Sequence, residues 1–319
     1  MKVALVGTGG WGRQHARVFA AHQEVDFCAI AGRNPEKTQC RADEFGVRAY
    51  TDIDQMLDVE RPDLVSLCLP NQGHFEPTMH VIERGYPLLV EKPLVFELSE
   101  AEALLEAAGD RFFAVCFNHR YAKPVQLAKE AIDARRLGQL MFTTWRFGGE
   151  GSSDHPHANL IETQCHGFDM LEYLCGPIAS LSAEMTQGLG AGLTTLSLAL
   201  KFQSGAVGGL VGSYDTSYAY QETQRIEVSG TEGRVVIDDT VRRYRFNATG
   251  SELGEIWEAG YFNDPDREFH RTFDFYIDAM ITAFKKGDPP PVHARAGLRA
   301  LELAHAAIRA YETGQRVLV

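Results

Sequence analysis

The chain has 319 residues, a length that predicts about two domains. Its 45% hydrophobic and 23% charged residues are typical of an ordinary soluble globular protein with enough apolar material for full cores. The formal net charge of −12 and the lack of a basic block argue against nucleic-acid binding.

The six cysteines are scattered and form no C-x-x-C pair, so the sequence predicts neither a zinc site nor a redox pair. No apolar run is long enough to span a membrane. Met1 leads directly into a predicted strand, which leaves no room for a signal peptide. We therefore expect a cytoplasmic protein with no membrane partner.

The first third of the chain alternates apolar runs with amphipathic helical patterns. Apolar strands separated by helices predict a parallel sheet that is covered on both faces. The expected strands are 2–6, 25–32, 48–50, 63–70, 87–93 and 112–118, and helices between them include 52–59, 75–84 and 99–108.

The pattern changes near residue 120, so we expect a first domain over 1–120 and a second over 121–319. Several later runs alternate apolar and polar residues, as in a sheet with one covered face. These runs are 139–148, 178–187, 193–203, 206–214, 223–229, 233–238 and 241–246, with helical segments at 122–136, 159–174, 267–286 and 294–312. The expected fold is an N-terminal doubly wound domain followed by an α+β domain with an open, mostly antiparallel sheet. The open face predicts a homodimer or homotetramer.

Residues 2–19 combine a buried strand, three glycines at G-x-G-x-x-G spacing and the start of a helix. This combination predicts a dinucleotide-binding Rossmann domain. Gly7 allows the turn off the strand, Gly9 lets a pyrophosphate approach the backbone, and Gly12 lets the helix pack closely. The helix start offers N–H groups and a positive dipole end to the phosphates. The loop residues expected to bind the cofactor are Gly7, Thr8, Gly9, Gly10, Trp11 and Gly12.

The end of the second strand bears on the identity of the cofactor. NAD-selective sites usually place an acid there to hold the ribose 2′-hydroxyl. This chain has Arg33 and Asn34 instead, and an arginine can pair with a 2′-phosphate. We expect NADP, with NAD as the alternative, in which Arg33 would be a solvated side chain stacked on the adenine.

Two more loops end strands at the same edge of the predicted sheet. The expected cofactor contacts after the fourth strand are Leu69, Pro70, Asn71 and His74. His74 is equally compatible with a helix-start role. Lys92, after the fifth strand, is expected at the nicotinamide, where it would donate to a substrate oxygen or a developing alkoxide. Glu91 is expected to fix either this loop or the nicotinamide ribose.

The predicted helix at 159–174 contains Glu162, His166 and Asp169. Glu162 and His166 are four residues apart and so share a helix face. A carboxylate beside an imidazole favours its protonated form and fixes its orientation, which suits a general acid–base pair. A surface ion pair is the alternative. Asp169 is expected to support the ring or to contact substrate.

Other expected substrate contacts come from the start and the strands of the second domain. They are Asn118, Arg120, Trp145, Arg146, His155, His157 and Tyr214. His155 and His157 lack a third ligand in register, so no metal is expected.

Together these segments resemble the glucose–fructose oxidoreductase/inositol dehydrogenase (Gfo/Idh/MocA) family over nearly the whole chain. The similar segments are GTGGWG, PNQGH, VEKPL, NHRYAKPVQLAKEAI, ETQCHGFDMLEYLCG and VSGTEGRVVID. The resemblance implies hydride transfer between a nicotinamide and a hydroxyl-bearing carbon of a sugar or cyclic polyol, with Lys92 and His166 around the reacting oxygen. Many dehydrogenating members have Asp four residues before the histidine, where this chain has Glu162.

We therefore expect an NADP-dependent dehydrogenase of sugars or polyols. In it His166 accepts the hydroxyl proton, Glu162 steadies the imidazolium and Lys92 stabilises the alkoxide. Two alternatives remain open: an enzyme that cleaves or epimerises glycosides while recycling a bound nicotinamide, and a non-catalytic redox or sugar sensor.

Overall fold

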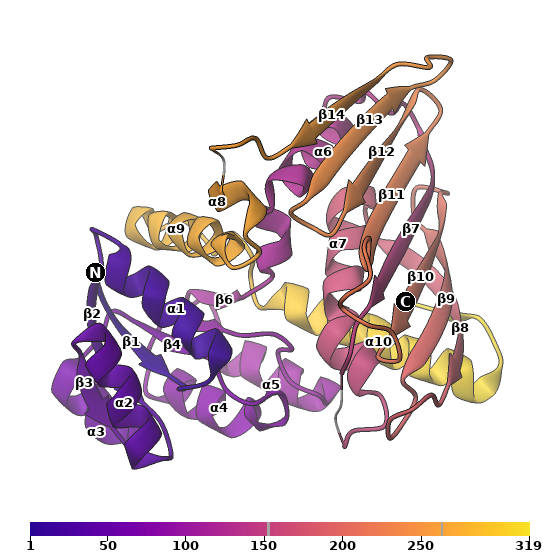
Figure 1. Cartoon of the computed structure of the whole chain (residues 1–319). Helices are drawn as coiled ribbons and strands as arrows, with labels where there is room; N and C mark the ends of the chain where they lie inside the picture. Colours follow the sequence, from indigo (N-terminus) through magenta and orange to yellow (C-terminus); the bar gives the residue numbers. More distant parts are fainter. Residues whose placement is uncertain (152–153, 263) are drawn as a thin grey trace. The chain divides into compact units, whose positions relative to one another are not determined.

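The computed structural model describes residues 1–151, 154–262 and 264–319 (Figure 1). The chain divides into two compact units. The first is Met1–Asn118 with Phe273–Leu298, and the second is His119–Thr272 with Arg299–Val319.

Residues 273–298 belong to the first unit, whereas the expected division into 1–120 and 121–319 assigned them to the second domain. Long-range hydrogen bonds explain it. Tyr276 Oη donates to Val115 O at 2.7 Å, and Ala294 N donates to Phe113 O at 2.8 Å. Strand β6(Phe113–Val115), which ends the first sheet, therefore packs against a segment that lies more than 150 residues later in the chain.

The first unit is a six-stranded sheet in which every neighbouring pair is parallel. The strand order is β3(Arg48–Tyr50), β2(Asp26–Ala31), β1(Lys2–Val6), β4(Leu64–Leu67), β5(Leu88–Val90) and β6(Phe113–Val115). Its helices are α1(Gly10–Ala21), α2(Pro35–Phe45), α3(Ile53–Glu60), α4(Phe75–Glu83), α5(Leu98–Ala108) and most of α9(Arg271–Lys286). This is the doubly wound fold predicted from the sequence, with the order reversing between β1 and β4.

Local sequence explains how one of these helices begins. Asn34 Oδ1 accepts a hydrogen bond from Lys37 N at 2.9 Å, and Pro35 occupies the first turn of α2. Both are strong start signals, because the side-chain oxygen satisfies an N–H that has no partner in the helix. The α2 start is thereby fixed at the cofactor edge of the sheet.

The second unit is built on a nine-stranded sheet, mostly antiparallel as predicted, with β7 and β10 as a parallel pair. The order is β14(Gly254–Glu258), β13(Arg243–Ala248), β12(Gly233–Asp238), β11(Gln224–Gly230), β7(Leu140–Gly148), β10(Val207–Ser213), β9(Thr195–Phe202), β8(Ile178–Thr186) and β15(Val317–Leu318). The edge strands β14 and β15 were not predicted. Both are short, and β14 has a largely exposed pattern that resembles a loop.

Helices α6(Lys123–Asp133) and α7(Cys165–Cys175) pack on one face of this sheet. The opposite face of the central strands carries exposed apolar side chains, including Phe142, Val207 and Val211. Val207 lies opposite Phe142 in the β7–β10 register. The predicted division into a covered and an open face is therefore present.

The predicted helix at 159–174 is not continuous. Residues Asn159–Thr163 form a π-helical turn, Gln164 follows, and α7 begins at Cys165. The predicted helix at 267–286 begins four residues later, as α9, and the short α8(Asp264–Arg267) precedes it, whereas α10(Arg295–Thr313) lies within two residues of its predicted ends.

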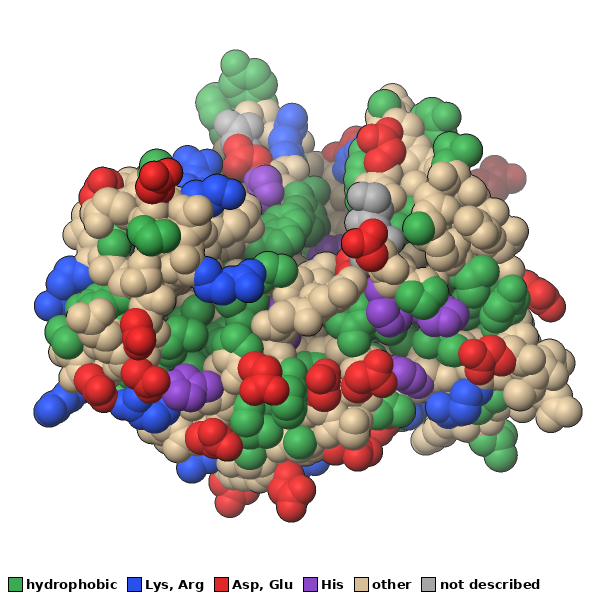
Figure 2. Space-filling model, turned by 90° about the horizontal axis from the view of Figure 1, so that it is seen from below, with side chains coloured by type: hydrophobic (Ala, Val, Ile, Leu, Met, Phe, Trp, Pro, Cys, Tyr) green, Lys and Arg blue, Asp and Glu red, His purple; other side chains and the backbone are tan. Residues whose placement is uncertain are grey.

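No helix among the described residues is both long enough and apolar enough to span a membrane. Figure 2 shows acidic and basic side chains interspersed over one face of the molecule, with the acidic ones more numerous, as the net charge of −12 predicts.

Candidate active site

A cavity of about 590 Å³ lies in the first unit at the carboxyl ends of β1, β2 and β4. In doubly wound sheets this edge, at the point where the strand order reverses, is where nucleotides bind. Ten residues predicted as cofactor contacts line it: Gly7, Thr8, Gly9, Gly10, Trp11, Gly12, Arg33, Asn34, Leu69 and Pro70.

The three glycines of the loop meet three different steric conditions. Gly7 has φ +126°, and a Cβ there would lie 2.0 Å from Cys68 O. A Cβ on Gly12 would lie 2.4 Å from Gly7 O, so the helix can approach the loop only without a side chain. The space beside Gly9 is open: apart from its chain neighbours, no atom of the described residues lies within 4 Å of an ideal Cβ. The backbone at Gly9 can therefore receive a diphosphate, and the loop fits a dinucleotide.

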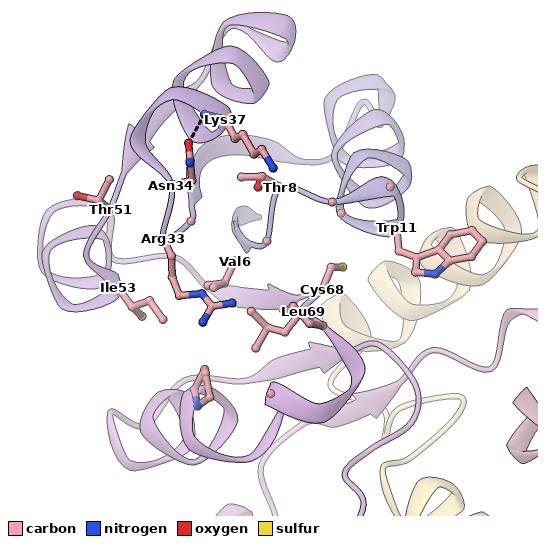
Figure 3. A pocket seen from close by; sticks show the side chains of 18 residues that line it. Val6, Thr8, Trp11, Arg33, Asn34, Lys37, Thr51, Ile53, Cys68 and Leu69 are labelled. Carbon is pink, nitrogen blue, oxygen red and sulfur yellow. Dashed lines mark hydrogen bonds between the residues drawn. The ribbon is translucent and has the colours of Figure 1, made fainter. Parts of the chain in front are cut away.

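Two cations line the cavity beside the end of β2. Figure 3 shows Arg33 and Lys37 extending into it from the end of β2 and the start of α2. No acidic side chain is among the described lining residues. Sequence reasoning found Arg33 but missed Lys37, which lies four residues later, one turn into the helix that Asn34 caps. Two positive charges without an acid favour a phosphate over a bare ribose hydroxyl.

His74 is buried and lies at the start of α4, where its Nε2 donates to Leu69 O at 3.0 Å. Burial lowers the pKa of His74, so its imidazole is neutral near pH 7. His74 thus lies at the helix start with its imidazole bonded to the preceding loop, and a cofactor contact by His74 stays a prediction. Asn71 lies in the 3₁₀ turn Asn71–Gly73, outside the cavity lining.

Glu91 follows β5 directly and contacts helix α1. Its side chain is buried and its Oε1 lies 2.9 Å from Nε2 of His15. Its Oε2 accepts a hydrogen bond from the backbone N–H of Lys92 at 3.1 Å. Of the two predicted roles, the structure supports loop fixation. Lys92 and Glu91 both lie outside the lining of the nucleotide cavity, and the Lys92–Pro93 peptide is cis.

In the second unit, His166 lies in α7 and is buried. Its ring stacks on that of His119, with ring centroids 3.9 Å apart and 6° between the planes. Phe269 packs edge-on against His119 at 5.2 Å. The stack fixes the orientation of both imidazoles. No pattern in the sequence predicted it.

Asp169 and Arg120, both predicted as substrate contacts, pair with each other. Arg120 Nε donates to Asp169 Oδ2 at 2.9 Å, and Nη2 donates to Oδ1. The guanidinium also lies 4.9 Å above the ring of Tyr173. Burial raises the pKa of Asp169, and the charge of Arg120 opposes that rise. Asn118 is buried at the start of the 3₁₀ turn Asn118–Tyr121.

Glu162 lies in the π-helical turn and is partly buried. The helix expected around Glu162 and His166 is interrupted by this π-helical turn, and the contact between the two side chains stays a prediction. π-Turns are frequent at functional sites. Here Gln164, at the junction, accepts from Trp145 Nε1 at 2.8 Å and donates to Asn159 Oδ1 at 3.0 Å.

Trp145 and Arg146 do not form the pocket wall that we expected. Trp145 is 1% exposed and packs under α7, where a Cβ on Gly167 would lie 2.7 Å from its Nε1. Arg146 points to the opposite, open face, because successive strand residues alternate, and its Nη2 donates to Glu222 O at 2.6 Å. Trp145 and Arg146 therefore lie on opposite faces of β7, and a substrate contact by Arg146 stays a prediction.

The loop histidines and Tyr214 are brought near one another. His155 and His157 have ring centroids 6.2 Å apart, and burial lowers the pKa of His157. His155 and Tyr214 line the same small cavity. Tyr214 Oη and Thr163 Oγ1 are 2.8 Å apart, and burial raises the pKa of Tyr214.

Comparison with known proteins places these two units in one family. Residues 1–119 match the family described as "Oxidoreductase family, NAD-binding Rossmann fold", and residues 129–319 match "Oxidoreductase family, C-terminal alpha/beta domain". The chain belongs to the Gfo/Idh/MocA oxidoreductase family. It is thus an oxidoreductase with an NAD-binding Rossmann domain.

Relatives and solved structures of the Gfo/Idh/MocA family match along the full chain. Myo-inositol 2-dehydrogenase of Thermotoga maritima is 25% identical over 99% of this chain and 98% of its own. D-xylose 1-dehydrogenase (NADP(+)) 2 of Haloferax volcanii is 25% identical over 99% of both. A structure of levoglucosan dehydrogenase in complex with NADH has a TM-score of 0.90 at 20% identity, and covers 100% of this chain and 99% of that one. The structural match supports the fold alone.

Proposed function

We propose that this chain transfers a hydride between NADP(H) and a hydroxyl-bearing carbon of a sugar or cyclic polyol. The observation that carries the proposal is the cavity at the β1–β4 switch point, with the open backbone at Gly9 and the cations Arg33 and Lys37. The relatives named for inositol and for D-xylose support the substrate class.

The nicotinamide, when bound, supplies the hydride chemistry. The acid–base work falls to Lys92, His166 and Glu162. His166 takes the hydroxyl proton, and its stacking on His119 holds the imidazole in one orientation for that role. Lys92 stabilises the developing alkoxide and Glu162 steadies the imidazolium.

NADP rather than NAD is the proposed cofactor. A 2′-phosphate would meet two cations and no carboxylate among the described residues of the cavity. The relatives include one named for NADP, and solved structures of other members contain NADH. The choice therefore depends on the side chains at the end of β2 rather than on the family.

The substrate contacts that we propose come from Asn118, Arg120, His155 and Asp169 together with the acid–base groups. The Arg120–Asp169 pair would act as a unit, with the guanidinium held flat for a sugar hydroxyl. The open face of the nine-stranded sheet, with Phe142, Val207 and Val211, is the proposed surface for a homodimer or homotetramer.

The function is tested by offering inositols, aldoses, anhydrosugars and their oxidised forms with NADP⁺, NAD⁺ or the reduced cofactors, and following nicotinamide absorbance. We expect a net absorbance change with a sugar or polyol, at a lower cofactor KM for NADP. Product formation without a net change would favour a recycled nicotinamide. Binding of both ligands without exchange of labelled hydride would favour a sensor.

A further inference from the structure

A buried polar network joins three elements of the first unit below the nucleotide cavity. His15, in the second turn of α1, is fully buried and uses both ring nitrogens. Nδ1 lies 2.9 Å from Ser66 Oγ in β4, and Nε2 lies 2.9 Å from Glu91 Oε1, one residue past β5. The rings of Phe19 and Phe273 pack edge-on around the imidazole. Burying such polar groups is unfavourable unless each is paired, so the network has one well-defined arrangement.

The carboxylate of Glu91 transmits this arrangement to Lys92. Its second oxygen accepts from the Lys92 backbone N–H, and Glu91 N donates to Leu67 O at 2.9 Å. Burial raises the pKa of Glu91, but the hydrogen bond and charge of His15 outweigh it and hold the pKa below its usual value. An ionised carboxylate makes a stronger hydrogen bond to an N–H than a neutral acid does.

The other end of the network is the helix of the glycine loop. His15 lies five residues after Gly10, the first residue of α1, whose first turn lines the nucleotide cavity. A helix of this length moves as a rigid body, so a displacement of its first turn also moves His15. The network thus connects the backbone that receives a diphosphate with the backbone that carries Lys92.

We propose that His15 and Glu91 are positioning residues, which hold Lys92 in place and couple it to occupation of the glycine loop. The inference rests on the proposed function for the role of Lys92. All of these contacts lie within the first unit. His15 does not line the nucleotide cavity, and the proposal gives it a positioning role.

A metal site is the competing interpretation. Among the described residues, His15, Glu91 and Cys116 form a group whose ligating atoms lie within 4.8 Å of one another. Both nitrogens of His15 already have protein partners, so a metal would have to displace one of these hydrogen bonds. Burial also raises the pKa of Cys116, which disfavours the thiolate that a metal needs.

The test compares His15→Gln and Glu91→Gln with His80→Gln. His80 pairs with Asp54 at the same 2.9 Å, but these side chains are 39% and 51% exposed. The first readout is amide hydrogen exchange of residues 88–96, with and without NADP⁺. We expect NADP⁺ to slow this exchange in the parent and in His80→Gln. In the two network variants exchange should be faster, and NADP⁺ should no longer slow it.

The second readout separates kcat from KM and from cofactor Kd. Misplacement of Lys92 should lower kcat about 10- to 100-fold, and loss of the coupling should raise the cofactor Kd by no more than the factor by which NADP⁺ slows exchange in the parent. Combining Glu91→Gln with Lys92→Met should add nothing to Lys92→Met alone, because the effect acts through Lys92.

Unchanged exchange at 88–96, additive losses, or equal loosening across the whole first unit with loss of NADP⁺ binding would overturn the proposal. So would a metal that copurifies and is lost in His15→Gln. A fully active Lys92→Met would instead overturn the proposed function, and the exchange data would then still report whether the coupling exists.

Discussion

The two sheets of this protein differ in how many of their faces are covered, and that difference decides where functional side chains can lie. Strands β4, β5 and β6 of the first sheet are buried along their whole length. Polar groups are therefore displaced to the loops beyond the strand ends, where Arg33 and Lys92 lie. The second sheet has one covered face, and its functional candidates lie on α7 and the turn before it, above that face. A strand-end rule finds sites in the first unit and fails in the second.

The largest effect is expected at Lys92, which lies in the loop after β5. Lys92→Met should lower kcat about 100- to 10,000-fold, because it removes a group that stabilises the alkoxide, while NADP⁺ binding remains. Steady-state kinetics and fluorescence titration measure the two. Lys286→Met, on the exposed end of α9, is the control and should change neither. Wild-type kcat in Lys92→Met would refute the rule at this loop.

The covered face of the second sheet is tested by the Arg120–Asp169 pair. Asp169→Ala should lower the free energy of unfolding by about 3 kcal/mol or more, because it leaves a largely buried guanidinium without its carboxylate. Denaturant unfolding measures the loss. Asp133→Ala breaks the exposed Lys129–Asp133 pair of α6 and should lose at most about 0.5 kcal/mol. Equal losses of unfolding free energy in the two variants would mean that burial does not strengthen the Arg120–Asp169 pair.

Arg33→Ala sharpens the comparison at the nucleotide end of the first sheet. It should raise the Kd for NADP⁺ about 10- to 100-fold, the value of one or two charge-assisted hydrogen bonds, and leave the Kd for NAD⁺ nearly unchanged. Isothermal titration with both cofactors measures the selectivity. Arg309→Ala, exposed on α10, is the matched control. A parallel loss for both cofactors would indicate stacking on the adenine.

The open face predicts association. Phe142→Glu and Val211→Glu place charges on side chains that are 42% exposed on the free sheet face, and should shift the molar mass in light scattering towards the monomer. Leu189→Glu changes a side chain that is 95% exposed, in the β8–β9 connection, and should leave the mass unchanged. If the parent protein is already a monomer in light scattering, the proposed association through this face is wrong.

The smallest effect concerns pH. Because burial lowers the pKa of His74, the unfolded chain binds its proton first as the pH falls. Stability from this group is complete above about pH 6.5 and decreases below it, by at most about 1.4 kcal/mol per pH unit. His74→Gln keeps an N–H donor for Leu69 O but does not titrate, so its unfolding free energy should fall less between pH 6.5 and 5. An unaltered slope in His74→Gln would contradict the assignment.

The sequence by itself determined those features of the fold that depend on neighbouring residues along the chain. The glycine loop, the cap at Asn34 and the alternating strands are local patterns, and they predicted the parallel sheet, the cavity edge and the half-covered second sheet. These features follow from backbone sterics and periodicity, which a window of a dozen residues contains.

Only the tertiary structure decided which partner each polar side chain has. Glu91 points inward because His15, 76 residues earlier, occupies the space beside it. Trp145 is buried because α7 covers its face of β7, and Asp169 faces Arg120, 49 residues before it. The return of residues 273–298 to the first unit depends in the same way on distant backbone groups. Hydrogen bonds and packing between remote segments leave no period in the sequence, so they become visible only when the chain is folded.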